Sequence, residues 1–280
     1  MTSDANFFSP DTPAQTSLRL GDPAGAPPCD VGFSAVQRPL AVLDPSTVRD
    51  HHVERCDAVD FLRKLPDASV DLVVTDPAYE SLEKHRAIGT TTRLKHSKSS
   101  SNDWFTIFPN ARFPELFAEA HRVLKKNSHL YLFCDAETMF VAKPLAEEAG
   151  FKFWKPLVWD KCSIGMGYHY RARYEFVLFF EKGKRKLKDL GIADIITHAR
   201  IRGGYPSEKP SAVAEVLVKQ SSDAGDLVVD PFCGSGSVGV AARTLGRRFA
   251  GSDICEEAVE TTIERLTAPR EQDGVEAGEE

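Results

Sequence analysis

Asp76, Pro77, Ala78 and Tyr79 follow one another in the chain and combine hydrogen-bond acceptors with an aromatic ring. The Asp76 carboxylate and the Pro77 carbonyl can accept both N–H bonds of one exocyclic amine, and Tyr79 offers a face on which a planar ring can stack. Two acceptors on one nitrogen localise its lone pair, which can then attack an electrophilic methyl group. The tetrapeptide therefore indicates methylation of a ring amine. A strand-terminal Asp-Pro turn with a packed tyrosine is the alternative.

A second segment, Asp-Pro-Phe-Cys-Gly-Ser-Gly at residues 230–236, lies between an apolar run and an Ala/Val-rich helical pattern. Gly234 and Gly236 allow positive φ and a close approach of the backbone to a ligand, and the N–H groups at the start of the next helix favour a polar or negative group. This pattern indicates a nucleotide-type site. Two alternatives are glycines that serve only the turn, and an NAD-type oxidoreductase, which would leave the tetrapeptide without a role.

Both segments follow predicted strands. Residues 70–75 are rich in β-branched side chains and predict a buried strand that brings Asp76 to its carboxyl end, where open parallel sheets keep their active sites. Further strands are expected at 129–134, 155–159, 174–180, 228–230 and 247–253, and helices at 53–66, 113–126, 139–149, 211–220 and 256–266. The alternation indicates an α/β fold with a doubly wound, mostly parallel sheet.

Composition is that of a globular protein, and 280 residues suffice for one large α/β domain. There is no run of about 18 apolar residues and no basic-then-apolar start, so we expect a cytoplasmic protein without membrane contact. The six cysteines stand singly, which indicates neither a disulfide framework nor a zinc site, and no metal is expected. The net charge of −6 still permits a nucleic-acid partner, because the basic residues are clustered.

The distribution of polar residues predicts the domain organisation. Residues 1–45 are rich in Ser, Pro, Gly and Asp and are expected to form a flexible arm, and the acidic stretch 268–280 a disordered tail. Between them, residues 46–267 are expected to form one domain. Within it, loops that are mobile or contact DNA are expected at about 80–110, where hydrophobic periodicity is lost, and at about 162–205, around the strand expected at 174–180.

Together, the Asp-Pro-Ala-Tyr strand end and the glycine turn resemble the amino-methyltransferases of DNA, which methylate adenine N6 or cytosine N4 with S-adenosylmethionine. The tetrapeptide precedes the glycine turn, which is the circularly permuted motif order of the β class. The resemblance extends from about Val53 to Leu266 and includes Tyr-Pro-Ser-Glu-Lys-Pro at residues 205–210. It implies the Rossmann-like fold of S-adenosylmethionine-dependent methyltransferases.

The resemblance also implies roles for individual residues. The catalytic residues would be Asp76, Pro77, Ala78 and Tyr79. The methionine and ribose parts of the cofactor would lie against Asp230, Phe232, Cys233, Gly234, Ser235 and Gly236. Asp253 would bind the ribose hydroxyls, with capping of the following helix as its alternative. Asp57 would contact the adenosine, and Ser207 and Lys209 the region of the cofactor carboxylate.

DNA contacts are expected from two loops that mix basic and aromatic residues. The first carries Lys84, Arg86, Arg93, Lys95 and Lys98, and the second Tyr168, Tyr170, Arg171 and Arg173. Solvated charge runs without a ligand are the alternative.

One residue departs from the common family pattern, because Ala78 replaces a second proline. Both acceptors and the aromatic ring are retained, so activity is still expected. Aspartate at the first position, where the cytosine N4 enzymes usually have serine, favours adenine N6. The expected function is therefore site-specific methylation of adenine N6 in double-stranded DNA by base flipping, in the nucleoid of a bacterium or phage-infected cell.

Several alternatives stay open at this stage. They are the same reaction on cytosine N4, methylation of RNA or of a glutamine amide, and a non-catalytic DNA-binding subunit of the same fold. A second copy of the chain and a cognate restriction enzyme are further candidate partners.

Overall fold

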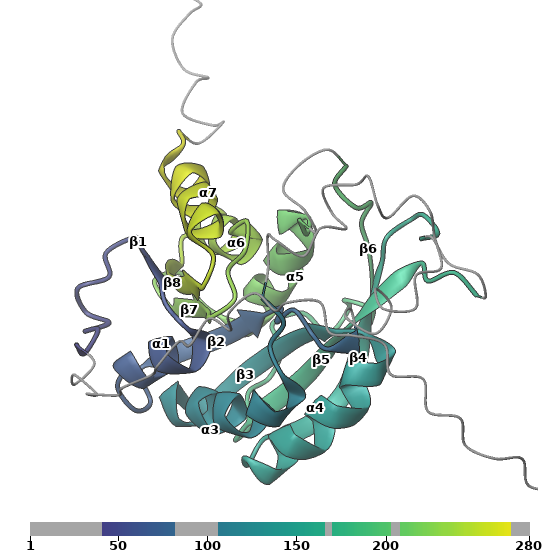
Figure 1. Ribbon diagram of the computed structural model, residues 1–280, viewed down its shortest axis with the longest axis horizontal. Helices are drawn as coiled ribbons and strands as arrows, with labels where there is room; N and C mark the ends of the chain where they lie inside the picture. The colour runs from purple at the N-terminus through teal and green to yellow at the C-terminus, as the bar shows by residue number, and fades with distance from the viewer. Residues whose placement is uncertain (1–40, 82–105, 166–169, 203–207, 270–280) are drawn as a thin grey trace, which may run out of the picture. The chain divides into compact units, whose positions relative to one another are not determined.

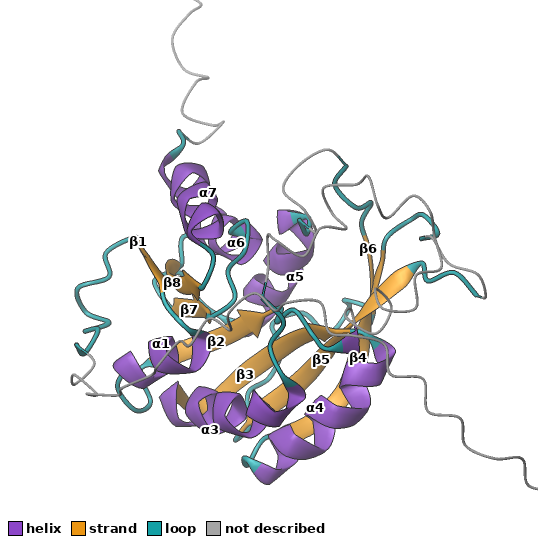
Figure 2. Ribbon diagram, in the orientation of Figure 1, coloured by secondary structure: helices purple, strands orange, loops and turns teal. Residues whose placement is uncertain are grey.

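Eight strands pair into a single sheet in a computed structural model that describes residues 41–81, 106–165, 170–202 and 208–269 (Figures 1 and 2). The strands are β1 (His51–Arg55), β2 (Val70–Thr75), β3 (Leu124–Cys134), β4 (Lys152–Asp160), β5 (Tyr174–Lys182), β6 (Ile195–Thr197), β7 (Leu227–Asp230) and β8 (Arg248–Asp253). Their order in the sheet is β1-β8-β7-β2-β3-β5-β4-β6. Only β5 runs antiparallel to its neighbours, β3 and β4, so the predicted mostly parallel sheet is confirmed.

Helices cover both faces of this sheet, as expected for a doubly wound fold (Figure 2). On one face lie α1 (Ala58–Lys64), α3 (Phe113–Val123) and α4 (Ala136–Glu148). On the other lie α5 (Ser211–Ser221), α6 (Ser237–Thr244) and α7 (Glu256–Thr267). Each face has its own apolar core, and β2 lies between them with all six of its residues buried. Asp76, the residue after β2, therefore directly follows a fully buried strand.

Two predicted elements need correction. The helix expected at 53–66 is preceded by β1, because Val53 pairs with Gly251 of β8, and the helix itself begins only after Asp57, which accepts hydrogen bonds from the N–H groups of Val59 and Asp60. The helix expected at 113–126 ends at Val123, and β3 begins at the next residue. The three-residue strand β6 was not expected, because it is too short for an alternating pattern and buries only its middle residue.

The chain before β1 contacts the domain. Leu43 N–H donates to Lys64 O over 2.9 Å, and Val48 is buried. The flexible arm predicted for residues 1–45 thus ends in chain that packs on the core, and its residues 1–40 lie outside the described ranges, as do residues 270–280 of the predicted tail. No helix in the described part of the chain is long and apolar enough to cross a bilayer.

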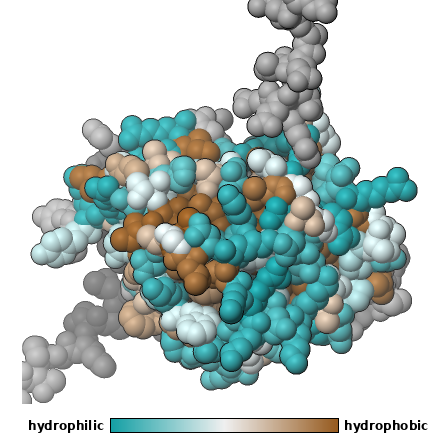
Figure 3. Space-filling model, turned by 180° about the vertical axis from the view of Figure 1, so that it is seen from behind, coloured by the Kyte–Doolittle hydropathy of each residue, from teal (hydrophilic) through white to brown (hydrophobic). Residues whose placement is uncertain are grey.

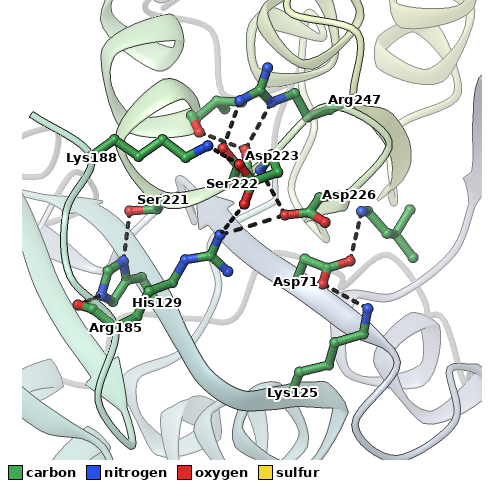
Figure 4. Close-up of polar contacts among 12 residues, drawn as sticks. Asp71, Lys125, His129, Arg185, Lys188, Ser221, Ser222, Asp223, Asp226 and Arg247 are labelled. Atoms are coloured by element: carbon green, nitrogen blue, oxygen red, sulfur yellow. Dashed lines mark hydrogen bonds and ion pairs between the residues drawn. The ribbon is translucent and has the colours of Figure 1, made fainter.

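A buried polar network joins the amino ends of the strands (Figure 4). His129 Nδ1 lies 2.7 Å from Ser221 Oγ, and Asp71 bonds both Lys125 Nζ and the Leu227 N–H. Burial lowers the pKa of His129 to about 4, so the imidazole is neutral near pH 7. This network holds β2, β3, β7 and α5 together at the edge opposite Asp76.

Apolar side chains gather in one area of the rear face (Figure 3). Large exposed apolar residues near β4 and β6 include Trp154, Leu190, Ile192 and Ile195, and they lie close to a mainly apolar cavity of about 200 Å³. Asp76 and the glycine turn do not line this cavity, so we do not assign it to the candidate site.

Candidate functional site

Asp76, Asp230 and Asp253 stand at the carboxyl ends of three neighbouring parallel strands, β2, β7 and β8. All three line one cavity of about 320 Å³. The tetrapeptide at Asp76 and the glycine turn after Asp230 therefore open on the same edge of the sheet. This juxtaposition was the main expectation from the sequence, and it follows from the strand order β8-β7-β2.

The tetrapeptide is held by the segment before α3. Ala78 O accepts a hydrogen bond of 2.7 Å from Phe108 N–H, and Tyr79 pairs with Phe108 in a short parallel bridge. Pro77 is buried, and Tyr79 lines the cavity with 8% of its surface exposed. Burial raises the pKa of Tyr79 well above its ordinary value, so the ring is a neutral aromatic face.

Asp76 lies in a cluster of four charged groups. Its carboxylate is bonded by Lys209 Nζ, which also lies 3.5 Å from Glu175 Oε2, and Glu175 Oε1 is bonded in turn by Lys161. Burial raises the pKa of Asp76, and Glu175 adds to this effect while Lys209 opposes it. Burial acts against the charge of Lys209, but the two carboxylates outweigh it and raise the lysine pKa. Lys209 is therefore charged near pH 7 and faces the Asp76 carboxyl, which burial makes harder to ionise.

The glycine turn has the geometry that its sequence requires. Gly234 and Gly236 have φ of 51° and 80°, and Gly236 is the N-cap of α6. A Cβ on Gly236 would lie 2.8 Å from Thr262 Cγ2, whereas one on Gly234 would meet no heavy atom nearer than 4.0 Å. Gly236 is thus needed for close packing on α7, and Gly234 leaves its side of the cavity open.

Asp230 ends β7 with only 2% of its surface exposed. Its Oδ1 accepts hydrogen bonds from Thr75 Oγ1 at 2.7 Å and from Phe232 N–H at 3.0 Å. Burial raises the pKa of Asp230 to about 7, although both hydrogen bonds favour the ionised form. The group therefore changes protonation near neutral pH.

Asp253 accepts from the Gly234 N–H at 3.0 Å and from the Cys255 N–H at 2.9 Å. The N-cap of α7 is Cys255, so Asp253 does not cap the helix in the sense considered from the sequence. Instead it ties the end of β8 to the glycine turn. Its expected contact with ribose hydroxyls stays a prediction.

Asp57 and Arg112 close the cavity on the side of α1. Arg112 donates two hydrogen bonds to the Asp57 carboxylate, at 2.7 and 2.9 Å, and its guanidinium carbon lies 5.2 Å from the centre of the Phe108 ring. Phe108 packs edge-on against Phe232, at 5.0 Å between ring centres. The Arg112 hydrogen bonds hold the pKa of Asp57 below its ordinary value despite partial burial. This end of the cavity offers aromatic rings beside a fixed carboxylate.

The remaining cofactor predictions fall on the glycine turn and on the approach to α5. Phe232, Cys233 and Ser235 line the cavity, and burial raises the pKa of the Cys233 thiol well above its ordinary value. Lys209 was expected beside the cofactor carboxylate. Its ammonium lies instead on Asp76 and Glu175, while its backbone carbonyl accepts from Ser237 Oγ at the start of α6. Ser207 lies outside the described residues.

Few of the predicted DNA contacts can be located. Tyr170 is fully accessible to solvent, and Arg171 is exposed. Arg173 is exposed, but it donates two hydrogen bonds to Asp160, at 2.6 and 2.8 Å. The other candidates, Lys84, Arg86, Arg93, Lys95, Lys98 and Tyr168, lie outside the described residues. DNA contact by these residues stays a prediction.

Arg112 and Glu175 line the cavity, and Lys161 bonds Glu175; none of these three charged residues was expected from the sequence. Each pairs with a residue distant in sequence, across 55 positions in the case of Arg112 and Asp57. The position of Glu175 at the start of a predicted strand was the one available signal. Within the described ranges, no group of three metal-ligating side chains occurs.

The model of the family described as DNA methylase, with the short name N6_N4_Mtase, matches residues 70–199 and 188–264. Among curated proteins, the chain is 28% identical over 251 residues to the DNA adenine methyltransferase YhdJ of Escherichia coli (strain K12), covering 75% of this chain and 80% of that protein. It is 25% identical over 238 residues to the type II methyltransferase M.HpaI of Haemophilus parainfluenzae, covering 75% and 72%.

Solved structures share the fold. The M1.HpyAVI–SAM complex aligns with a TM-score of 0.56 at 20% identity, over 78% of this chain and 100% of that one. The PvuII DNA methyltransferase, which is cytosine-N4-specific, aligns with a TM-score of 0.61 at 16% identity, over 80% of this chain and 89% of that one. The Rossmann-like methyltransferase fold expected from the sequence is therefore confirmed.

Proposed function

Because this chain belongs to the N6/N4 family of DNA methylases, we propose that it methylates the N6 amine of adenine in double-stranded DNA, with S-adenosylmethionine as the methyl donor. The observation that carries the proposal is the shared cavity, in which Asp76 and Tyr79 stand beside the glycine turn. A base flipped out of the DNA duplex can reach Asp76 and Tyr79 while the cofactor binds at the glycine turn.

The cavity residues fit this cofactor. Asp57 and Asp253 present carboxylates that can accept from an amine and from hydroxyls, next to the rings of Phe108 and Phe232. The open space at Gly234 permits a close approach of a ligand to the backbone. When bound, S-adenosylmethionine supplies an electrophilic methyl group.

The chain's own residues prepare the target amine. Asp76 and the Pro77 carbonyl accept its two N–H bonds and localise the lone pair on nitrogen, and the face of Tyr79 supports the ring. Methyl transfer leaves a positive charge on nitrogen, and the proton can leave afterwards to Asp76, whose pKa is raised by burial. Lys209 keeps the carboxylate in place while this occurs.

The choice of adenine rests on Asp76 and on the similarity to YhdJ, which is named as an adenine methyltransferase. Mass spectrometry of digested DNA, after incubation with cofactor carrying an isotopically labelled methyl group, tests it directly. We expect labelled N6-methyladenine. Labelled N4-methylcytosine would establish the alternative, and label in RNA or in a glutamine amide would move the reaction to another substrate.

The site is tested by Asp76→Ala. We expect a loss of methylation of at least about 100-fold, with cofactor binding retained in a titration. Asp194→Ala is the control, because Asp194 pairs with Lys155 on the surface and lies outside the cavity. If Asp76→Ala methylated DNA at the wild-type rate, the assignment of the tetrapeptide would be wrong. A second copy of the chain and a cognate restriction enzyme remain predictions as partners.

A further inference from the structure

Glu175 reaches the candidate site because β5 runs against its neighbours. It is the second residue of β5, pairs with Trp159 at the end of β4, and is followed by Phe176, which pairs with Cys134 at the end of β3. The start of β5 therefore lies at the same sheet edge as the carboxyl end of β2. Glu175 shares a face of β5 with Val177 and Phe179, both in the core under α5, and Lys209 stands just before that helix.

The two oxygens of Glu175 face different lysines. Oε1 is bonded by Lys161, and Oε2 lies 3.5 Å from Lys209 Nζ. Oε2 is shielded from solvent and makes no hydrogen bond within the described part of the chain. The side chains of Lys209 and Glu175 are only 14% and 19% exposed, so water screens this pair weakly. An attractive charge without a hydrogen bond thus acts on Lys209 in addition to that of Asp76.

This arrangement determines how far the positive charge of Lys209 neutralises the Asp76 carboxylate. A lysine that pairs with one carboxylate neutralises it and occupies an oxygen that a substrate amine would need. Here the ammonium lies between two carboxylates, and the ring of Phe133, 5.2 Å from Nζ, packs beside it. Lys161 balances Glu175 on the outer side. Lys209 therefore divides its charge between Asp76 and Glu175 and does not neutralise Asp76 alone.

We propose that Glu175 is a positioning residue for methyl transfer, which shares Lys209 with Asp76 and thereby keeps the Asp76 carboxylate an effective acceptor for the target amine. The inference rests on the proposed function and adds a residue to it. Glu175 acts through Lys209 and Asp76, and it exchanges no atom or proton with the substrate. The negative charge of the Asp76 carboxylate stabilises the positive charge that develops on the target nitrogen during methyl transfer.

The test compares Glu175→Gln, which keeps the shape but removes the charge, with Glu175→Asp, which keeps the charge. Single-turnover methyl transfer is measured with saturating cofactor and DNA across a range of pH. We expect Glu175→Gln to lower the rate by about 10–100-fold, with little change in the dissociation constant for cofactor, and Glu175→Asp to restore part of the rate. Glu181→Gln is the matched control, because Glu181 is a buried, hydrogen-bonded glutamate on the same strand and lies far from the cavity.

The pH dependence separates this role from a structural one. The charged and titratable groups that face Glu175 or Asp76 are Lys161 after β4, Lys209 before α5, Tyr79 after β2, Cys134 at the end of β3 and Asp230 at the end of β7. The charge of Glu175 opposes ionisation of Asp76, so its removal should move the acid limb of the rate profile to lower pH. A purely structural role would lower the rate without moving that limb.

A second measurement does not depend on DNA methylation. Aspartate labelled at the side-chain carboxyl carbon allows the titration of Asp76 to be followed by NMR. This titration should move to lower pH in Glu175→Gln but not in Glu181→Gln. An unmoved titration, or a rate equal to that of the wild type, would overturn the role of Glu175. If the wild-type chain methylates no DNA, the proposed function fails by itself, and the NMR titration still decides whether Glu175 controls Asp76.

Discussion

Thr75 Oγ1 donates a hydrogen bond of 2.7 Å to Asp230 Oδ1, so the last residue of β2 holds the last residue of β7. Both side chains are almost completely buried. The contact fixes the position of Asp76, which follows Thr75, relative to the glycine turn, which follows Asp230. The two halves of the site are therefore connected by a side-chain bond in addition to strand pairing.

Replacing Thr75 with valine should weaken the site through Asp230. Valine has nearly the same shape but no hydroxyl, so a buried carboxylate oxygen loses a donor, at a cost of about 1–3 kcal/mol in the free energy of unfolding. We also expect weaker cofactor binding. Urea unfolding and a cofactor titration measure the two effects. Thr75→Ser keeps the hydroxyl and should retain most of the affinity, and equal losses in both variants would show that the hydrogen bond is not the cause.

The raised pKa of Asp230 predicts a pH-dependent stability. A carboxyl whose pKa is higher in the folded than in the unfolded chain stabilises folding below about pH 4, and this contribution is lost as the pH rises through about 7. Asp230→Asn removes the titration and can keep the acceptor oxygen. Relative to this variant, the wild type should lose about 2–3 kcal/mol of unfolding free energy between about pH 5 and pH 8.

Urea unfolding of both proteins at the two pH values provides the measurement for Asp230. Parallel stability curves would mean that Asp230 is already ionised at pH 5 in the folded chain. The same substitution should reduce cofactor affinity, because Asp230 lines the cavity beside the glycine turn.

Much of this arrangement could be predicted because it depends on local sequence. Short apolar strands followed by Asp76 and by Asp230 place functional groups at strand ends, and in a parallel sheet such ends share an edge. The positive φ of Gly234 and Gly236 follows from residue type. The sequence predicted a doubly wound, mostly parallel sheet but no strand order, and the structure supplies the order that brings β7 next to β2.

The charge pairs of the site could not be predicted in the same way. Lys209 lies 133 positions from Asp76, and Arg112 lies 55 positions from Asp57. Nothing in residue type or spacing selects these partners, because the contacts depend on where loops cross the sheet edge. Glu175 was missed for a related reason: the strand expected at 174–180 was given no direction, and only an antiparallel strand brings its amino end to this edge.

Arg112 offers a test of the cofactor end of the cavity. Arg112→Met removes two hydrogen bonds from Asp57 and raises its pKa toward the ordinary value, so we expect cofactor affinity to fall by about tenfold with little change in the single-turnover rate. Arg63→Met is the matched control. Arg63 also connects α1 to α3, through Asp60 and Glu115, but it does not line the cavity. Equal losses of affinity in both variants would assign the effect to helix packing.

Gly236 and Gly234 have similar backbone conformations but different surroundings, which makes them a matched pair. Alanine at Gly236 would place Cβ 2.8 Å from Thr262 Cγ2 and 3.1 Å from Thr262 Cα, whereas alanine at Gly234 meets open space. Left-handed strain of about 1 kcal/mol applies to both. We therefore expect Gly234→Ala to lower the free energy of unfolding by about that amount, and Gly236→Ala by about 2–4 kcal/mol, because α7 must shift.

Thr262→Ser separates the clash at Gly236 from other effects of the substitution. Serine removes the methyl group that the new Cβ would meet first and keeps the hydroxyl that donates to Gly234 O over 2.8 Å. Combined with Gly236→Ala, it should restore part of the stability, because the Cγ2 contact is gone while the contacts with Oγ1 at 2.9 Å and Cα at 3.1 Å remain. Urea unfolding of the two single variants and the double variant measures the coupling. Strictly additive losses would mean that the turn relaxes away from α7 and that contact with Thr262 does not determine the need for glycine at this position.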